Sequence, residues 1–243
     1  MRERPGGDVG PLALVLEERV RIYLFDVDGT LLRGEGAGKR ALQAAFDDAF
    51  GRPDAFDRVV FAGATDRAIV RQALGVIGVR ATEAAIDEVL AHYLTLLPAA
   101  VAESGYRAEC GVLDALEAVG GQADAALGLG TGNVEMGARI KLGAAGLNHY
   151  FGFGGFGSDA EDRAELLEVG ARRGAAALGV ARHACEVRVI GDSVRDVSAA
   201  HAIGAFCLAV ATGGTDAGAL RAAGADIVFD RLAAPGALEA LIG

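Results

Sequence analysis

Two apolar runs, far apart in the chain, each end in an aspartate. The run IYLF is followed by Asp26, and the run VRVIG is followed by Asp192. Short runs of this kind are typical of strands buried on both faces of a parallel sheet. A second acid follows each of them, Asp28 two residues after Asp26 and Asp196 four residues after Asp192. Because chemistry in open parallel sheets lies beyond the carboxyl ends of the strands, the sequence predicts a carboxylate site there.

Strand and helix patterns alternate through most of the chain. Further strands are expected where the segments AALGLG, YFGFGGF, AFCLAV and DIVF occur, with helical periodicity between them. This alternation predicts an α/β fold: a parallel, Rossmann-like sheet flanked by helices on both faces.

The segment from 34 to 105 interrupts that alternation, because its pattern is helical throughout. Thr65 is the expected N-cap of one of its helices, with Asp66 in the first turn. We therefore expect an α/β core domain formed by residues 1–33 and 106–243, and an inserted all-helical cap domain formed by residues 34–105.

Composition excludes several classes of protein. The 243 residues carry a net charge of −10, which argues against a surface that binds nucleic-acid phosphates. The three cysteines include no CxxC pair, which favours free thiols over a disulfide framework or a zinc site. The amino-terminal segment lacks the apolar stretch of a signal peptide, and no run of about 18 apolar residues occurs. We expect a soluble, cytoplasmic protein with no membrane partner, and the oligomeric state stays open.

Carboxylates gathered without cations repel one another, and a hard divalent cation resolves this. Mg²⁺ prefers oxygen ligands and keeps several waters, so a few carboxylates suffice to bind it. Such a site suits phosphoryl transfer: one carboxylate attacks phosphorus and another moves protons. An ordinary turn would explain the pentapeptide DVDGT by itself, but not its place after a buried strand. An EF-hand loop needs glycine at its sixth position, whereas Gly29 is fourth.

The segment DVDGTL, which begins at Asp26, resembles the first motif of the haloacid dehalogenase-like hydrolase superfamily. The resemblance extends over nearly the whole chain from Arg21 onward, and GDSVRDVSAA is similar to the fourth motif. It implies that Asp26 is the nucleophile and Asp28 the acid/base. It also implies a Mg²⁺ site formed by Asp26, Asp28, Asp192 and Asp196, with Asp196 either a ligand or a residue that holds water.

The second motif of the superfamily is similar to LGLGTGN. The resemblance implies that Thr131 binds a phosphoryl oxygen, assisted by the backbone N–H groups of Gly132 and Asn133. The third motif normally supplies a lysine. Here Arg163 occupies the expected place and can hold two oxygens at once. Lys141 is the competing candidate, but its position within a helix favours a solvated side chain.

The helical insertion is similar to the cap of one subgroup, whose members include phosphoglycolate phosphatases, phosphosugar mutases, phosphonate hydrolases and dehalogenases. The dehalogenases lack the second aspartate of the motif, which this chain has as Asp28, and the mutases carry a histidine soon after the motif, which this chain lacks. Phosphonate hydrolases use a cap lysine to form a Schiff base; Lys39 is the only lysine of the insertion, and no feature marks it for that role. The resemblance therefore implies a Mg²⁺-dependent phosphohydrolase, phosphoglycolate phosphatase-like, acting on a small phosphorylated metabolite. A phosphosugar mutase or a pyrophosphatase of the same superfamily is the alternative. Candidates for a second anion-binding group are Arg33, Lys39, Arg40, Arg67 and Arg71.

One alternative belongs to a different class. The glycine-rich segment from Gly128 to Asn133 is also typical of a methyl-donor- or nucleotide-binding loop. Such sites require an acid at the end of the following strand, and YFGFGGF has none. That interpretation also leaves Asp26 and Asp192 without a role.

Overall fold

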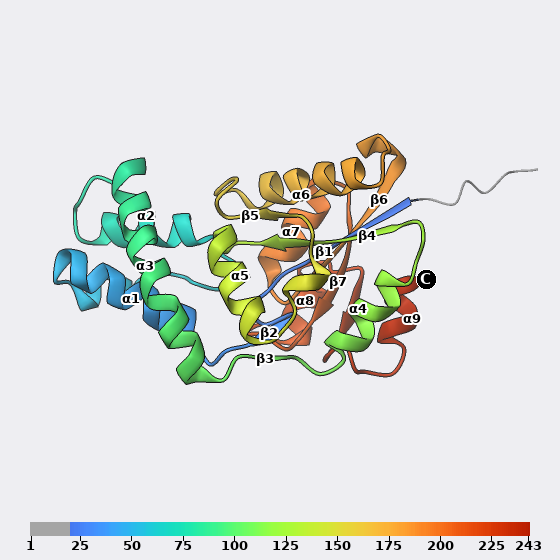
Figure 1. Cartoon of the computed structure of the whole chain (residues 1–243), viewed down its shortest axis with the longest axis horizontal. Helices are drawn as coiled ribbons and strands as arrows, with labels where there is room; N and C mark the ends of the chain where they lie inside the picture. The colour runs from blue at the N-terminus through green and yellow to red at the C-terminus, as the bar shows by residue number, and fades with distance from the viewer. Residues whose placement is uncertain (1–19) are drawn as a thin grey trace, which may run out of the picture.

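The computed structural model describes residues 20–243 (Figure 1). The amino-terminal part of the predicted core domain, residues 1–19, lies outside the described residues. A six-stranded sheet runs through the described chain in the order β5-β4-β1-β6-β7-β8, and every neighbouring pair is parallel. Its strands are β1 (Val20–Phe25), β4 (Ala125–Thr131), β5 (Gly154–Phe156), β6 (Cys185–Gly191), β7 (Phe206–Val210) and β8 (Ile227–Phe229). The parallel α/β sheet predicted from the sequence is confirmed.

Helices cover both faces of this sheet. Alternate residues of β1 point to opposite faces, Tyr23 and Phe25 to one and Ile22 and Leu24 to the other. The first pair packs in the same core as α4 (Val112–Gly120), α5 (Glu135–Ala144) and α9 (Ala237–Ile242). The second pair packs in the same core as α6 (Arg163–Ala177), α7 (Val194–Ala202) and α8 (Ala217–Ala222). Because all four side chains are fully buried, β1 is the centre of a three-layer core.

The residues inserted after β1 are helical, and they lie together beside one end of the sheet (Figure 1). They form α1 (Ala37–Phe50), α2 (Asp66–Val76) and α3 (Glu83–Ser104), with the short 3-10 helix η1 (Pro53–Phe56). The chain enters and leaves this part through β2 (Leu32–Arg33) and β3 (Arg107–Ala108), which pair as an antiparallel ribbon. Two further 3-10 helices, η2 (Asn148–Tyr150) and η3 (Arg182–Ala184), lie in loops of the α/β part.

The N-cap expected at Thr65 and the apolar character of α3 can both be compared with the structure. Thr65 is the N-cap of α2, as predicted, because its side chain accepts a hydrogen bond from the backbone N–H of Ala68. The helix α3 is long and apolar enough to cross a bilayer by length and composition alone. Its stripe of buried side chains instead packs in the core shared with α1 and α2, as in an ordinary core helix.

Candidate active site

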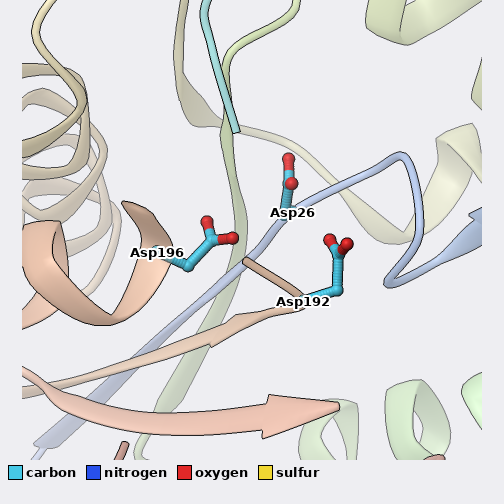
Figure 2. Close-up of side chains that lie close together, drawn as sticks. All are labelled: Asp26, Asp192 and Asp196. Atoms are coloured by element: carbon cyan, nitrogen blue, oxygen red, sulfur yellow. The ribbon is translucent and has the colours of Figure 1, made fainter. Parts of the chain in front are cut away.

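Three aspartates converge at the carboxyl ends of the central strands. Asp26 directly follows β1 and Asp192 directly follows β6, and these two strands are neighbours in the sheet. Asp196 lies in the first turn of α7. One carboxylate oxygen from each of the three lies within 4.8 Å of the other two, and Figure 2 shows the three side chains close together, with Asp196 pointing toward the other two.

Asp196 is held by the protein through both of its oxygens. Oδ2 accepts hydrogen bonds from the backbone N–H and the hydroxyl of Ser193, which together form a capping box at the start of α7. Oδ1 pairs with Arg163, with Nη2 at 2.6 Å. The fully buried carboxylate therefore holds the arginine, and neither oxygen is left without a partner.

Arg163 is the cation at the centre of the cluster. Its Nη2 also lies 2.9 Å from Oδ2 of Asp26, so one guanidinium bridges Asp26 and Asp196. The side chain is 7% exposed and lies at the first residue of α6, where the third motif was expected. The surface pairing with Asp159 or Glu161 that would have removed it from the site is not formed.

The single positive charge of Arg163 does not balance the negative charges of three buried carboxylates. Burial, opposed by the charge of Arg163 and reinforced by that of Asp196, raises the pKa of Asp26 to about 6. Burial and the charges of Asp196 and Asp26 raise the pKa of Asp192 to about 8. Oδ1 of Asp192 accepts a hydrogen bond from Thr30 Oγ1, while Oδ2 receives none from the described residues and the residue lines the pocket. The three carboxylates offer only oxygen ligands, and Oδ2 of Asp192 accepts no hydrogen bond from the described residues. Such a set of ligands fits a hard cation such as Mg²⁺.

Mg²⁺ affinity is expected to rise with pH. Because the raised pKa values leave Asp192, and below pH 6 also Asp26, protonated in the metal-free protein, binding must expel a proton. The dissociation constant should fall about tenfold per pH unit between pH 6 and pH 8 and level off above that. Calorimetric titration of the wild type with Mg²⁺ in buffers of different ionisation enthalpy measures both the affinity and the protons released. An affinity independent of pH would contradict the protonated cluster.

The same shifts predict how the stability of the metal-free protein varies with pH. When the pKa of a carboxyl is higher in the folded than in the unfolded state, the free energy of unfolding falls as pH rises from the unfolded pKa to the folded pKa. The contribution of Asp26 and Asp192 should therefore lower the melting temperature of the metal-free protein at pH 8 relative to pH 5. Added Mg²⁺ should raise the melting temperature more at pH 8 than at pH 5.

Two glycines leave room for Asp192. A Cβ added at Gly29 would lie 2.6 Å from Oδ2 of Asp192, and one added at Gly213 would overlap the same oxygen. Gly29 also has a φ of 84°, a conformation that glycine adopts readily. The loop after β7 therefore approaches the carboxylate so closely that it admits no side chain at position 213.

Replacing Gly213 by Ala is expected to weaken Mg²⁺ binding by about tenfold or more, since the new methyl group displaces a ligand that must be placed within a few tenths of an ångström. The matched control is Gly214→Ala, because a Cβ at the next residue would meet no atom within 4 Å. Calorimetry with Mg²⁺ on both variants, with thermal melts to confirm folding, measures the difference. Equal affinities for the two variants would show that Asp192 is not the oxygen donor that matters.

Asp28 lies outside this group of three. Its Oδ2 accepts hydrogen bonds from Asn133 Nδ2 at 2.9 Å and from Lys141 Nζ at 2.5 Å, and its Oδ1 accepts one from the hydroxyl of Tyr106. Burial raises the pKa of Asp28, but the charge of Lys141 and these hydrogen bonds outweigh it and hold the pKa below its usual value. The structure therefore places the Asp28 carboxylate beside the cluster as an anion paired with lysine, and not among the three converging carboxylates.

The sequence-based expectation for Lys141 was wrong. Its side chain is 5% exposed, and its ammonium donates to Asp28 Oδ2 and Asn133 Oδ1. Lys141 and Arg163 therefore do not compete for one role, because each is buried at the site against a different aspartate. The sequence held one signal: Gly137 and Ala138 lie four and three residues earlier on α5, and such small residues are typical of an inward helix face. Tyr106 was missed altogether, and nothing in its sequence neighbourhood indicated it.

The predicted phosphate-binding residues follow β4. Thr131 is the last residue of that strand, is fully buried, and has its hydroxyl near enough to Asp26 to lower the pKa of that carboxyl. The backbone N–H of Asn133 donates to Thr131 Oγ1 at 3.3 Å, so it is partly used within the loop. Gly132 lies against the inserted helices, because an added Cβ would sit 2.5 Å from the carbonyl oxygen of Ala64. The structure thus brings Thr131, Gly132 and Asn133 to the edge of the aspartate cluster.

A cavity of about 360 Å³ opens above these strand ends. The α/β part supplies its acidic floor, and the inserted segment supplies an opposite wall that includes Lys39, Phe61 and Tyr93. This volume is at the small end of the range for small-molecule sites.

Most of the residues that were candidates for binding a second anionic group are already paired. Arg33 lines the cavity but binds Glu109 through two nitrogens. Arg67 and Arg71 form ion pairs with Glu83, Asp87 and Glu161. Arg40 donates to the backbone carbonyl of Glu35 and does not line the cavity. Lys39 remains: it lines the cavity and its Nζ lies 4.7 Å from the ring centre of Phe61.

The nucleotide-loop alternative is not favoured by the structure. Gly128 and Gly130 lie within β4, not in a loop. A Cβ at Gly128 would overlap the ring of Phe153, and one at Gly130 would lie 2.5 Å from the side chain of Leu167. Both glycines are therefore explained by tight packing of the sheet against neighbouring side chains.

The chain is similar to known proteins in one sequence segment and in its fold. Residues 169–235 match the sequence model of a family described as HAD-hydrolase-like. No curated protein matches the sequence. Three solved structures with similar folds, each less than 25% identical in sequence, illustrate the likeness.

The structure of CbbY from Rhodobacter sphaeroides, a mutant in complex with xylulose-(1,5)bisphosphate, has a TM-score of 0.69 and 19% identity over 91% of this chain and 99% of its own. A predicted phosphoglycolate phosphatase from Haemophilus somnus has a TM-score of 0.61 and 18% identity over 88% and 95%. A putative β-phosphoglucomutase from Thermotoga maritima has a TM-score of 0.59 and 23% identity over 91% and 98%.

Proposed function

We propose that this chain is a Mg²⁺-dependent phosphohydrolase of the haloacid dehalogenase-like group, because residues 169–235 match the model of that family and the fold is similar to that of a predicted phosphoglycolate phosphatase. The observation that carries the proposal is the convergence of Asp26, Asp192 and Asp196 within 4.8 Å at the ends of two neighbouring strands. The substrate is a small phosphomonoester, and Asp26 attacks its phosphorus to form an aspartyl-phosphate.

Asp26 and Asp192 are the direct Mg²⁺ ligands in this proposal. The bound cation would offset the charge of the cluster and of the phosphoryl oxygens. Asp196 acts differently from the two ligands, because both of its oxygens are occupied by Ser193 and Arg163. It fixes Arg163 beside the nucleophile, and Arg163 holds the oxygens of the phosphoryl group as it transfers.

Thr131 and Asp28 complete the proposed chemistry. The Thr131 hydroxyl positions Asp26 and, with the backbone of Gly132 and Asn133, binds the phosphoryl oxygens. Asp28 moves the protons. Its protonated form, a minor fraction because Lys141 holds the pKa low, gives a proton to the leaving oxygen in the first step. The carboxylate so formed takes a proton from the attacking water in the second step.

We further propose that residues 34–105 are a cap over a core formed by residues 1–33 and 106–243. Two observations support the division. The β2–β3 ribbon lies at both crossings between the two parts, and the cavity is lined from both sides. Lys39 is the cap residue best placed to meet a second anionic group on the substrate. A cytoplasmic location rests on the sequence alone and stays a prediction.

Assays with a chromogenic aryl phosphate, in Mg²⁺ and in EDTA, test the proposed function. Mg²⁺ should support steady release of the phenol and of inorganic phosphate in equal amounts, and EDTA should abolish it. No release in either condition, across a panel of phosphate esters, would overturn the proposal.

The phosphosugar mutase alternative is favoured by one observation, the likeness in fold to a putative β-phosphoglucomutase. A mutase returns the phosphoryl group to the sugar, so the product analysis separates the two reactions. With a hexose 1-phosphate as substrate, a phosphatase yields free hexose and inorganic phosphate, whereas a mutase yields the 6-phosphate with little inorganic phosphate. Hydrolysis of inorganic pyrophosphate in the same panel would identify a pyrophosphatase.

A further inference from the structure

The buried lysine of α5 has no part in the chemistry proposed so far. Lys141 Nζ donates to Asp28 Oδ2 at 2.5 Å and to Asn133 Oδ1 at 2.6 Å. The same Asn133 donates to Asp28 Oδ2 and to Thr131 Oγ1. A continuous hydrogen-bonded chain therefore joins Thr131, Asn133 and Lys141 to the carboxylate of Asp28.

Direct binding of substrate by Lys141 is disfavoured by its surroundings. The side chain is 5% exposed, and two of its three ammonium protons are used by Asp28 and Asn133. Both residues line the cavity, but the side chain of Asp28 is 45% exposed. The aspartate is therefore the more accessible of the two groups and the one better placed to reach the substrate.

The helices of the proposed cap enclose the ammonium from the other side. A Cβ added at Gly38, in α1, would lie 2.9 Å from Lys141 Nζ, and the Tyr93 hydroxyl of α3 lies beside the same spot. Asp66, at the start of α2, accepts a hydrogen bond from the backbone N–H of Val134, the N-cap residue of α5. Residues of α1, α2 and α3 thus hold the helix that carries Lys141 and the end of its side chain.

From these contacts we infer that Lys141 is a positioning residue, which holds the Asp28 carboxylate in the orientation needed for proton transfer. The helices of the proposed cap in turn hold the Lys141 side chain in place. This inference rests on the proposed function, since it assigns Lys141 to the acid/base step of that reaction. A freely rotating Asp28 would still be present in its absence but would seldom point at the leaving oxygen or at water. Such a loss falls on catalysis and hardly on substrate binding.

A double-mutant cycle with Asp28 tests the inference. Lys141→Met is expected to lower kcat by about 10- to 100-fold and to change KM by less than about threefold. In an Asp28→Asn background the same change should alter kcat by less than about threefold, because the group that Lys141 positions is already gone. An effect as large in that background as in the wild type would show that Lys141 acts on substrate directly, and would overturn the inference.

Comparing kcat on substrates with different leaving groups separates a role in proton transfer from a merely structural role of Lys141, which would affect all substrates equally. An alkyl phosphate such as glycerol phosphate requires a proton on its leaving oxygen, whereas a 4-nitrophenyl leaving group hardly does. Lys141→Met should therefore lose more kcat on the alkyl than on the aryl ester. Equal losses on both substrates would overturn the assignment to the acid/base step.

The cap side is tested without removing any charge. Gly38→Ala adds a methyl group against the ammonium within a helix, where alanine is the better helix former. It should lower kcat by about threefold or more, with an unchanged or higher melting temperature. The matched control is Gly75→Ala in α2, where a Cβ meets no atom within 4 Å and kcat should stay at the wild-type value. Equal kcat for the two alanine variants would overturn the role of the cap helices.

These experiments separate the two proposals. A wild type with no phosphatase activity overturns the proposed function and this inference with it. An active wild type whose Lys141→Met variant is folded and equally active overturns the inference alone. If Lys141→Met fails to fold, the Asp28→Asn/Lys141→Met double variant, which has no unpaired buried charge, and Gly38→Ala supply the comparison.

Discussion

Replacing Asp26 by Asn should reduce turnover to below about 0.01% of the wild-type rate, because an amide cannot attack phosphorus and no other carboxylate occupies its place at the end of β1. Folding should survive this change. The pKa of Asp26 is raised to about 6 mainly by burial, so its charge is a cost to the folded protein near pH 8. The neutral amide removes that cost, and Arg163 keeps its partner Asp196.

Steady-state assays on an aryl phosphate, with thermal melts at pH 8 in EDTA, measure both parts of this prediction. The melting temperature of Asp26→Asn should equal or exceed that of the wild type. Asp114→Asn, which removes an exposed acid from α4, is the matched control and should leave activity unchanged. More than a few per cent of residual activity in Asp26→Asn would show that another group attacks phosphorus.

Removing the arginine of the cluster should damage both activity and stability. Arg163→Met leaves the fully buried Asp196 and the buried Asp26 without their cation. Breaking a buried ion pair by deleting one partner costs about 3–5 kcal/mol of unfolding free energy. Loss of a fixed positive charge beside the transferring phosphoryl group should lower kcat by about 10²- to 10³-fold.

Arg163→Lys separates charge from geometry. It keeps a cation and should recover activity to within about tenfold of the wild type, though a lysine holds two oxygens less well than a guanidinium. Arg173→Met, on the same helix, is the control: its half-exposed pair with Asp159 is worth at most about 1 kcal/mol. Urea unfolding and steady-state kinetics on the three variants test the prediction. A stable and active Arg163→Met would contradict the role given to the guanidinium.

The core of the site could be predicted because it depends on short-range patterns. Asp26 and Asp192 follow buried apolar runs directly, and the carboxyl ends of parallel strands meet at one edge of the sheet. Asp196 follows from the capping geometry of Ser193 at the start of α7. Each of these placements requires only one strand or one helix end to be identified correctly.

The remainder depended on contacts between segments far apart in the chain. Arg71 pairs with Glu161, which is 90 residues away, and no local pattern indicates that pairing. The ribbon of β2 and β3 has two residues in each strand, too few for any alternation to show. Lys141 was misjudged because a lysine within a helix is normally solvated, whereas here Asp28 and the inserted helices surround it.

The chemistry proposed for Asp26 and Asp192 is tested most directly by a crystal structure of the wild type with Mg²⁺ and beryllium fluoride, which mimics a phosphoryl group on a carboxylate. The account predicts beryllium bonded to a carboxylate oxygen of Asp26, and Mg²⁺ about 2.0–2.1 Å from oxygens of both Asp26 and Asp192. A fluoroberyllate on any other residue, or Mg²⁺ bound away from these two side chains, would contradict it.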